Sequence, residues 1–148
     1  MPDYHLVAAN LIEEDGRYLL VQEGKEHVIG KWNVPGGSIE EKEEAKKAAV
    51  REAKEEAGVE VEIQDLTGVF FDKSDYLDGT VVIIVFNSSI SETDFSLQPQ
   101  SDEEILDAEF YTKEEIRELD IRTPFVIDAI ENLEEGETAE PKAVKDYR

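Results

Sequence analysis

Short apolar runs separated by polar turns dominate the pattern of hydrophobic and polar positions along this chain. Such runs predict β-strands when they are rich in β-branched or aromatic side chains. They occupy residues 5–12, 17–22, 32–34, 66–72, 80–87 and 108–111. The run at 80–87 is almost continuous in β-branched residues, so we expect it to lie in the middle of a sheet and to be buried on both faces.

One long stretch of the chain predicts a helix. Residues 41–57 contain only helix-forming residue types, with no glycine, proline or threonine among them. Ser38 precedes this stretch with Glu41 three residues later, the spacing of a capping box. Gly58 follows it in the position of a left-handed C-terminal cap. The small side chains of this helix predict a face that can approach other backbone closely.

The last third of the chain predicts two further helices. Thr112 and Glu115 have the spacing of another capping box, and residues 124–133 read as a final helix. Strands on both sides of one central helix, with a helix at the end, indicate an α/β fold in which helices cover a mixed sheet. We expect a single domain over residues 1–135 and a mobile acidic tail over residues 136–148.

Composition and charge narrow the range of functions. The 148 residues include 37 acidic and 15 basic side chains, a net charge of -22, and no cysteine. Disulfides and thiolate chemistry are therefore excluded. A surface this acidic repels nucleic acid and anionic membranes, so we expect neither as a partner. No signal peptide or membrane-spanning run is visible, which makes a cytoplasmic protein the expectation.

Three glutamates in the predicted central helix carry the clearest chemical signal. Glu52, Glu55 and Glu56 stand at i, i+3 and i+4, so their side chains share one helical face. Their charges repel one another, and a divalent cation would remove that conflict. Carboxylate oxygens together with water and substrate phosphates are the surroundings that Mg²⁺ prefers, and Mn²⁺ accepts similar ligands. We therefore expect a Mg²⁺ site, with Mn²⁺ as a substitute.

The segment around these glutamates, GGSIEEKEEAKKAAVREAKEEAGV at residues 36–59, resembles the signature of the Nudix hydrolase family, of the MutT-like kind. That signature is Gly, five residues, Glu, seven residues, then Arg-Glu-U-X-Glu-Glu-X-Gly-U, where U is a bulky aliphatic residue. Its seven fixed residues are all present: Gly37, Glu43, Arg51, Glu52, Glu55, Glu56 and Gly58. One aliphatic position departs, because Ala53 is small. The resemblance implies an α/β/α sandwich and a metal-dependent pyrophosphohydrolase.

The resemblance also gives roles to residues other than the three glutamates. It implies that the carbonyl of Gly36 is a further metal ligand. It implies that Arg51 ties the helix to the preceding loop and orients the glutamates, and the alternative for Arg51 is a simple i,i+4 pair with Glu55. Glu43 is expected to be structural, either as a carboxylate in the first turn of the helix or paired with Lys47.

Another acidic residue often comes from a distal loop in this family, as a metal ligand or a base. The candidates here are Glu103 and Glu104, and we favour Glu104 over the alternative of a solvated loop carboxylate. The general base would be one of Glu52, Glu55 and Glu104. The sequence does not decide among these three.

The expected reaction is attack of water on a phosphorus of a diphosphate bridge, in a nucleoside diphosphate linked to another moiety. One alternative is a non-hydrolytic nucleotide-binding or sensor domain on the same scaffold, and another is an acidic cation-binding protein without chemistry. The partner is a small nucleotide-type molecule, and a homodimer is compatible with the pattern.

Residues that recognise the substrate are not visible in the signature. Lys25 and Lys31 could meet phosphates, although solvated loop lysines are the interpretation we favour. Five aromatic residues could stack on a base, and for each we favour a place in the core or the sheet. They are Tyr4, Trp32, Phe70, Phe71 and Tyr76.

Overall fold

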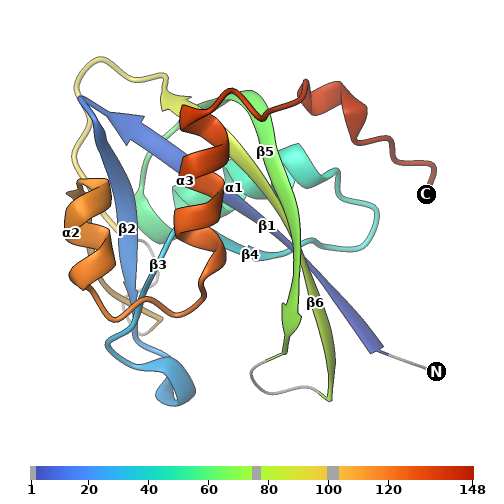
Figure 1. Ribbon diagram of the computed structural model, residues 1–148, viewed down its shortest axis with the longest axis horizontal. Coiled ribbons are helices and arrows are strands. Elements are labelled where there is room, and N and C mark those ends of the chain that lie inside the picture. The colour runs from blue at the N-terminus through green and yellow to red at the C-terminus, as the bar shows by residue number, and fades with distance from the viewer. Residues whose placement is uncertain (1–2, 75–77, 100–103) are drawn as a thin grey trace.

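The computed structural model describes residues 3–74, 78–99 and 104–148, and its secondary structure follows the predicted order closely. The strands are β1 Asp3–Glu14, β2 Arg17–Glu23, β3 Trp32–Asn33, β4 Gly36–Ser38, β5 Val61–Lys73, β6 Gly79–Ile90 and β7 Ile105–Tyr111. The helices are α1 Ala45–Ala57, α2 Lys113–Glu118 and α3 Phe125–Glu134, with short 3₁₀ turns η1 Glu26–Val28 and η2 Pro141–Ala143. Figure 1 shows these elements along the chain.

The seven strands form one mixed sheet. Along its main path the order is β3-β2-β1-β6-β5, while β4 pairs with β1 and β7 pairs with β2. β1 and β6 run parallel over ten residue pairs from Asp3–Gly79 to Ile12–Ser88, and the other pairs are antiparallel. The expected central position of residues 80–87 is confirmed, because β6 lies between β1 and β5.

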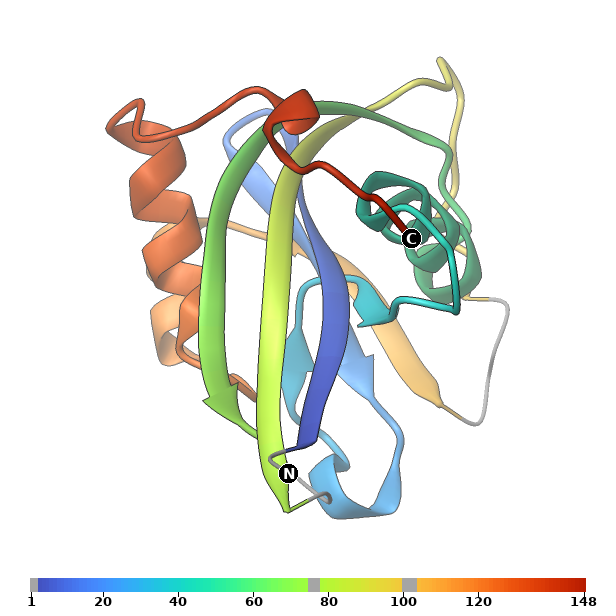
Figure 2. The same cartoon turned by 90° about the vertical axis from the view of Figure 1, so that its right-hand side faces the viewer.

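Helices cover both faces of this sheet, so the predicted α/β/α sandwich is confirmed. In Figure 2, α1 lies on one side of the long strands and α3 on the other. The α3 side is filled by apolar side chains that include Leu11, Leu20 and Val85, together with Val126 and Ile130 of the helix. None of the helices in the described ranges is long and apolar enough to cross a membrane.

The α1 side is packed through alanines. Ala48, Ala49, Ala53 and Ala57 have no solvent exposure. Their small side chains let the helix backbone approach the sheet so closely that Asn10 Nδ2 of β1 donates a 2.8 Å hydrogen bond to the carbonyl of Ala49. Asn10 Oδ1 accepts a 2.6 Å bond from Ser88 Oγ of β6. One buried amide therefore joins the helix to two central strands.

The start of α1 differs from the prediction. The helix begins at Ala45 rather than near residue 41, and Ser38 belongs to β4, so the expected capping box is wrong. The intervening loop has a left-handed residue, Lys42, with a φ of 62°. In this loop the backbone N–H of Glu43 donates to the carbonyl of Glu40, so a turn forms where helix propensity alone would favour a further helical turn. Every residue in this loop is a good helix former, so propensity alone places the start too early.

The other caps agree with the sequence. Gly58 adopts a φ of 74° and donates its N–H to the carbonyl of Lys54, as a left-handed C-terminal cap does. Thr112 and Glu115 form the predicted capping box at the start of α2. The final helix begins and ends within one residue of its predicted bounds.

The mobility expected for residues 136–148 and the domain boundary expected at residue 135 remain predictions. In the structure this segment passes over β5, where Ala139 and Leu66 exchange two backbone hydrogen bonds of 2.8 and 2.9 Å. It then reaches the loop that precedes α1.

Candidate active site

The acidic face of α1 is fixed by the apolar face of the same helix. Ala53 and Ala57 are fully buried against Ile12 and Val21 of the sheet. With that face docked, the 3.6-residue period turns Glu52, Glu55 and Glu56 of the helix away from this apolar cluster. The site is therefore built on two regular elements, a helix and the short strand β4.

Glu56 is held against β4. Its Oε1 accepts a 2.8 Å hydrogen bond from the backbone N–H of Gly36. Burial raises the pKa of Glu56 well above its usual value, the Gly36 N–H opposes that rise, and the charges of Glu52 and Glu23 add to it. Lys25 lowers the same pKa. Burial and the neighbouring acidic charges therefore outweigh the effects of Lys25 and of the Gly36 N–H on the Glu56 carboxylate.

Glu52 lies beside Glu56, and its pKa is also raised by burial. Its side chain is 12% exposed. Burial raises the pKa of Glu52, Arg51 lowers it, and Glu55 raises it again. A Cβ atom on Gly37 would lie 2.5 Å from Glu52 Oε1, so glycine at this position makes room for the carboxylate.

The two glycines that precede α1 belong to a strand. Gly36 and Gly37 are extended in β4 and pair with Ala9 and Ala8 of β1. Neither has a positive φ among the described residues. Glycine is needed here for close approach, because a Cβ on Gly36 would lie 2.7 Å from the carbonyl oxygen of Ala8.

Arg51 organises the side chains around these glutamates. Its Nε and Nη2 donate to the two carboxylate oxygens of Glu43 at 2.9 and 3.0 Å. Nη1 donates to Glu52 at 2.8 Å and to Glu55 at 3.2 Å, and Nη2 also donates to the carbonyl of Ser38 at 3.0 Å. Arg51 thus makes both the i,i+4 pair and the link to the preceding segment that the family resemblance implies.

Glu43 is structural, but in neither of the two ways considered from the sequence. It lies in the loop before the helix and pairs with Arg51 rather than Lys47. The hydrogen bonds from Arg51 lower the pKa of Glu43, so this carboxylate is charged over the whole neutral range. Seven residues lie between Glu43 and Arg51, and the left-handed turn at Lys42 brings the two side chains together.

Glu55 and Glu104 are more exposed than Glu52 and Glu56. Glu55 has a side chain that is 49% exposed and points to Arg51. Glu104 is exposed at the start of β7, where its carbonyl accepts a 2.7 Å bond from the Gly24 N–H. This places its backbone next to the loop that carries Lys25. Glu103, the second distal candidate, lies outside the described residues.

Two charged residues at the site were not predicted from the sequence. Glu23, at the end of β2, is only 4% exposed, and it lies 3.4 Å from Arg122. The backbone N–H of Arg122 donates a hydrogen bond to the carbonyl of Trp32 in β3, and this bond holds Arg122 near Glu23. A glutamate after an apolar strand gives no sign of burial, and the arginine is about a hundred residues away, so only the fold reveals the pair.

A cleft of about 120 Å³ opens beside Glu56. Its walls include β1, β4, β6, the ends of β2 and β5, and the segment before α3. Its charged side chains are Glu23, Lys25, Glu56, Asp72, Lys73 and Arg122. A larger hollow of about 330 Å³ is lined by the first turn of α1 and residues 141–148 and does not include the glutamates of the signature. The smaller cleft is therefore the candidate substrate site.

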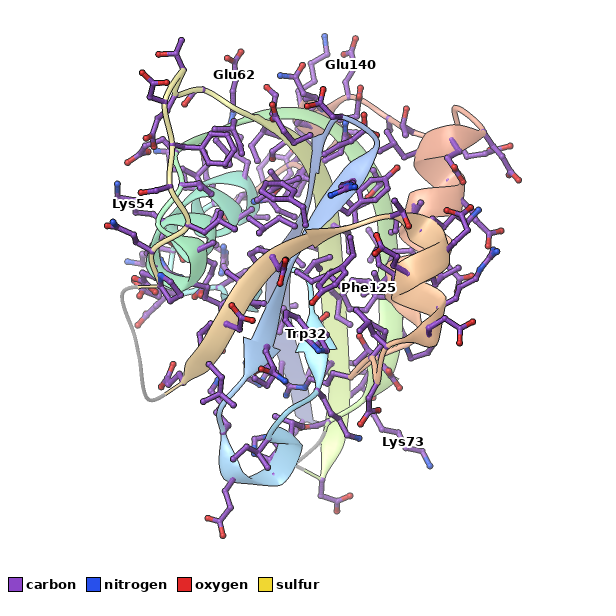
Figure 3. The ribbon with its side chains drawn as sticks, turned by 90° about the vertical axis from the view of Figure 1, so that its left-hand side faces the viewer. Trp32, Lys54, Glu62, Lys73, Phe125 and Glu140 are labelled. Atoms are coloured by element: carbon purple, nitrogen blue, oxygen red, sulfur yellow. The ribbon has the colours of Figure 1, made fainter. Side chains whose placement is uncertain are left out.

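The aromatic residues follow the preference for core or sheet positions. Trp32 is buried edge-to-face against Tyr111, and Phe70 lies on Phe125. Figure 3 shows Trp32 and Phe125 inside the molecule, whereas Lys54 and Glu62 extend outwards. Tyr4 and Phe71 are exposed sheet residues, and Tyr76 lies outside the described residues.

Glu56 therefore lines a cleft that also contains basic side chains, and Glu52 lies behind the glycine strand β4. The family model of the NUDIX domain matches residues 3–139, so this chain belongs to the Nudix family, as its signature predicted. A solved structure of a NUDIX hydrolase from Nitrosomonas europaea is 28% identical, with 98% of each chain covered and a TM-score of 0.86.

Relatives with named substrates match parts of the chain. An ADP-ribose pyrophosphatase from Methanocaldococcus jannaschii is 36% identical over 76 residues, which is 51% of this chain and 45% of that protein. A diphosphoinositol polyphosphate phosphohydrolase 3-alpha from Mus musculus is 38% identical over 80 residues, which is 54% of this chain and 48% of that protein. In each case the match spans less than half of the relative's length.

Proposed function

We propose that this chain is a pyrophosphohydrolase that cleaves a phosphoanhydride bond with the help of a divalent metal ion. The observation that carries the proposal is the pair Glu52 and Glu56, two partly buried carboxylates. Burial raises the pKa of both, and the charges of Glu55 and Glu52 respectively add to the rise. Burying two carboxylates whose charges are only partly compensated costs free energy, and positive charge supplied by a ligand offsets that cost. Perturbed carboxylates in a cleft are typical of catalytic sites.

The residues present fit a Mg²⁺ ion, with Mn²⁺ as a substitute. Within residues 3–74, 78–99 and 104–148, no three histidine, aspartate or glutamate side chains are grouped so as to hold a metal by themselves. Mg²⁺ does not need such a group, because it is usually bound by one or two carboxylates, water and substrate phosphates. Glu52, Glu56 and the carbonyl of Gly36 would hold it, and Glu55 would join them on release from Arg51.

The side chains around the proposed metal site would then have distinct roles. A bound metal ion would supply positive charge to the phosphates and lower the pKa of the attacking water. Arg51 fixes the rotamer of Glu52 through the bond at 2.8 Å. Lys25 and Arg122 bring positive charge to the cleft in a chain of net charge -22 and would attract an anionic substrate. The base is one of Glu52, Glu55 and Glu104.

The proposed substrate is a small molecule in which a diphosphate joins a nucleoside to another moiety. ADP-ribose, named in one relative, is such a compound. The net charge of -22 argues against nucleic acid and membranes as partners. A cytoplasmic location is part of the proposal, which covers a monomer and a homodimer equally.

Turnover of a substrate panel tests the proposal. ADP-ribose, dinucleoside polyphosphates, nucleoside triphosphates, sugar nucleotides and diphosphoinositol phosphates would be assayed for released phosphate or pyrophosphate, or for new monophosphate products. We expect activity on at least one compound with Mg²⁺ or Mn²⁺ and none with EDTA. Glu52→Gln and Glu56→Gln should each lower kcat by about 10²-fold or more, whereas the exposed Glu62→Gln should leave it unchanged.

The same experiment separates the alternatives. A nucleotide-binding or sensor domain would bind a panel compound, detected as a rise in melting temperature, without turning any over. An acidic cation-binding protein would bind the metal and none of the compounds. Full activity in Glu56→Gln would contradict the assignment of the site even if hydrolysis is observed.

A further inference from the structure

Residues 139–148 lie across the α1 side of the sheet edge and end at the loop before α1. We call this segment the strap. Figure 2 shows it running from the edge strand β5 towards the start of α1. It is attached at three places: the Ala139–Leu66 backbone pair, Val144 against the cluster of Ala45 and Phe86, and Arg148.

The attachment at Arg148 is the most specific of the three. Arg148 Nη2 donates a 2.6 Å hydrogen bond to the carbonyl of Glu43. Its guanidinium is itself held by the carboxylate of Asp146, with N–O distances of 2.7, 3.0 and 3.2 Å. A planar fork that is held on one side by a carboxylate presents its remaining donors in a fixed direction.

Glu43 is one of the residues that position Arg51, together with the carbonyl of Ser38. Its carboxylate receives two of the hydrogen bonds of Arg51, and a third bond to the same carboxylate comes from the N–H of Glu40. Arg51 in turn donates to Glu52 and Glu55. Four links therefore run in series from Asp146 through Arg148, Glu43 and Arg51 to the glutamates of α1.

The loop that contains Glu43 needs an external support. Lys42 holds a φ of 62°, which costs energy for a residue other than glycine and persists only where surrounding contacts fix it. The N-cap position of α1, Glu44, makes no side-chain capping bond. The strap leaves a hollow of about 330 Å³ beneath it, so discrete contacts rather than continuous packing hold it to the loop.

We propose that Arg148 is a positioning residue for the catalytic glutamates, acting through the carbonyl of Glu43 and the guanidinium of Arg51. This inference rests on the proposed hydrolytic function for its kinetic consequence and on the structure alone for its geometry. Removing the Arg148 bond would free the Glu43 loop, loosen the Arg51 fork and widen the range of positions of Glu52 and Glu55.

The test compares Arg148→Met with Lys142→Met in the full chain. Lys142 is another long cationic side chain of the strap. Within the described residues its ion pair is with Glu140, two positions earlier in the chain. We expect Arg148→Met to lower kcat by about 10-fold, as loss of an outer-shell partner does, with little change in KM. Arg148→Lys keeps one donor and should recover part of the loss, and Lys142→Met should match the unmodified chain.

Two further measurements distinguish positioning from general support of the fold. In ¹⁵N-labelled protein, the Nε–H of Arg51 should exchange with solvent several-fold faster in Arg148→Met than in Lys142→Met. In a Glu43→Gln background, Arg148→Met should have almost no additional effect on kcat, because residues that act in series are not additive.

The proposal is overturned by unchanged exchange of the Arg51 Nε–H in Arg148→Met. It is equally overturned by a 10-fold loss of kcat that persists undiminished in the Glu43→Gln background. Absence of turnover in the unmodified chain would count against the hydrolase proposal alone, and the Arg51 exchange measurement would then decide the role of the strap.

Discussion

Glu56 Oε1 lies 2.8 Å from the backbone nitrogen of Gly36 and accepts its hydrogen bond. This contact joins the last turns of α1 to β4, two elements separated by the loop of residues 39–44. It also aims a carboxylate with a raised pKa at the cleft, where burial and the neighbouring charges of Glu52 and Glu23 oppose ionisation. Metal binding therefore needs the charged form of Glu56, whereas the metal-free fold is more stable with the neutral form.

Replacing Glu56 with Gln should stabilise the metal-free fold while it removes activity. A carboxyl whose pKa is higher in the folded than in the unfolded state makes a stabilising contribution that is fully present below its unfolded pKa. That contribution is lost as the pH rises through the folded pKa. Gln carries no charge and can still accept the Gly36 bond, so its advantage is complete above the raised pKa.

Thermal unfolding with EDTA at pH 4 and at pH 8 measures this effect. We expect the melting temperature of Glu56→Gln to exceed that of the unmodified chain by a few degrees at pH 8, given about 2–4 °C for each kcal/mol in a chain of this size. The difference should shrink at pH 4. Equal melting temperatures at pH 8 would show that Glu56 is not destabilising.

Lysine in place of Arg51 should impair both the site and the fold. A single ammonium cannot reproduce the two bonds to Glu43 together with those to Glu52 and Glu55. We expect kcat to fall by about 10–100-fold and the free energy of unfolding to fall by about 1–3 kcal/mol. Steady-state kinetics and urea unfolding check the two effects.

The control for this change is Arg117→Lys. Arg117 is half-exposed, and it pairs with Glu131 of α3 at 3.6 Å. Exposed ion pairs contribute about 0–1 kcal/mol, so this variant should keep nearly normal stability and activity. A loss of activity in Arg117→Lys equal to that in Arg51→Lys would contradict the special role of Arg51.

Alanine at Gly37 should act on catalysis more than on stability. The added Cβ would lie 2.5 Å from Glu52 Oε1, and the flexible carboxylate would give way before the backbone of β4. We expect kcat to fall by about 10²-fold, since small displacements of catalytic groups have effects of that order. Gly136→Ala is the comparison, because it strains a φ of 71° with no neighbour within 4 Å of its Cβ.

Comparison of the two alanine variants separates catalysis from strain. Gly136→Ala should lower the melting temperature slightly and leave kcat unchanged. Gly37→Ala should lose kcat and keep a circular dichroism spectrum like that of the unmodified chain. Normal turnover in Gly37→Ala would mean that Glu52 does not need its present position.

Leucine at Asn10 should destabilise the fold without touching the cleft. Asn10 is fully buried and bonds to the carbonyl of Ala49 and to the hydroxyl of Ser88. Leucine leaves the Ser88 hydroxyl without its acceptor and removes the second bond to the Ala49 carbonyl, which keeps its bond within the helix. A buried unsatisfied group costs about 1–3 kcal/mol. Urea unfolding should show this loss, and Asn10→Leu combined with Ser88→Ala should recover part of it. No recovery would indicate that Ser88 has another partner.

The sequence determined those features that depend on neighbours along the chain. The short apolar runs place six of the seven strands in the described residues, and the signature places the glutamates on one face of α1. Gly58 and the Thr112–Glu115 pair mark helix ends correctly because caps are local interactions of three or four residues. The family and the α/β/α fold follow from these local features together.

Only the tertiary structure decided which distant groups meet. Glu23 and Arg122 pair because β2 and the segment after α2 both border β3, and Arg148 reaches Glu43 because the strap crosses β5. The start of α1 belongs here too, since the Arg51–Glu43 bond and the strap favour a loop where every residue prefers a helix. Local propensities differ by fractions of a kcal/mol, and contacts between distant residues outweigh them.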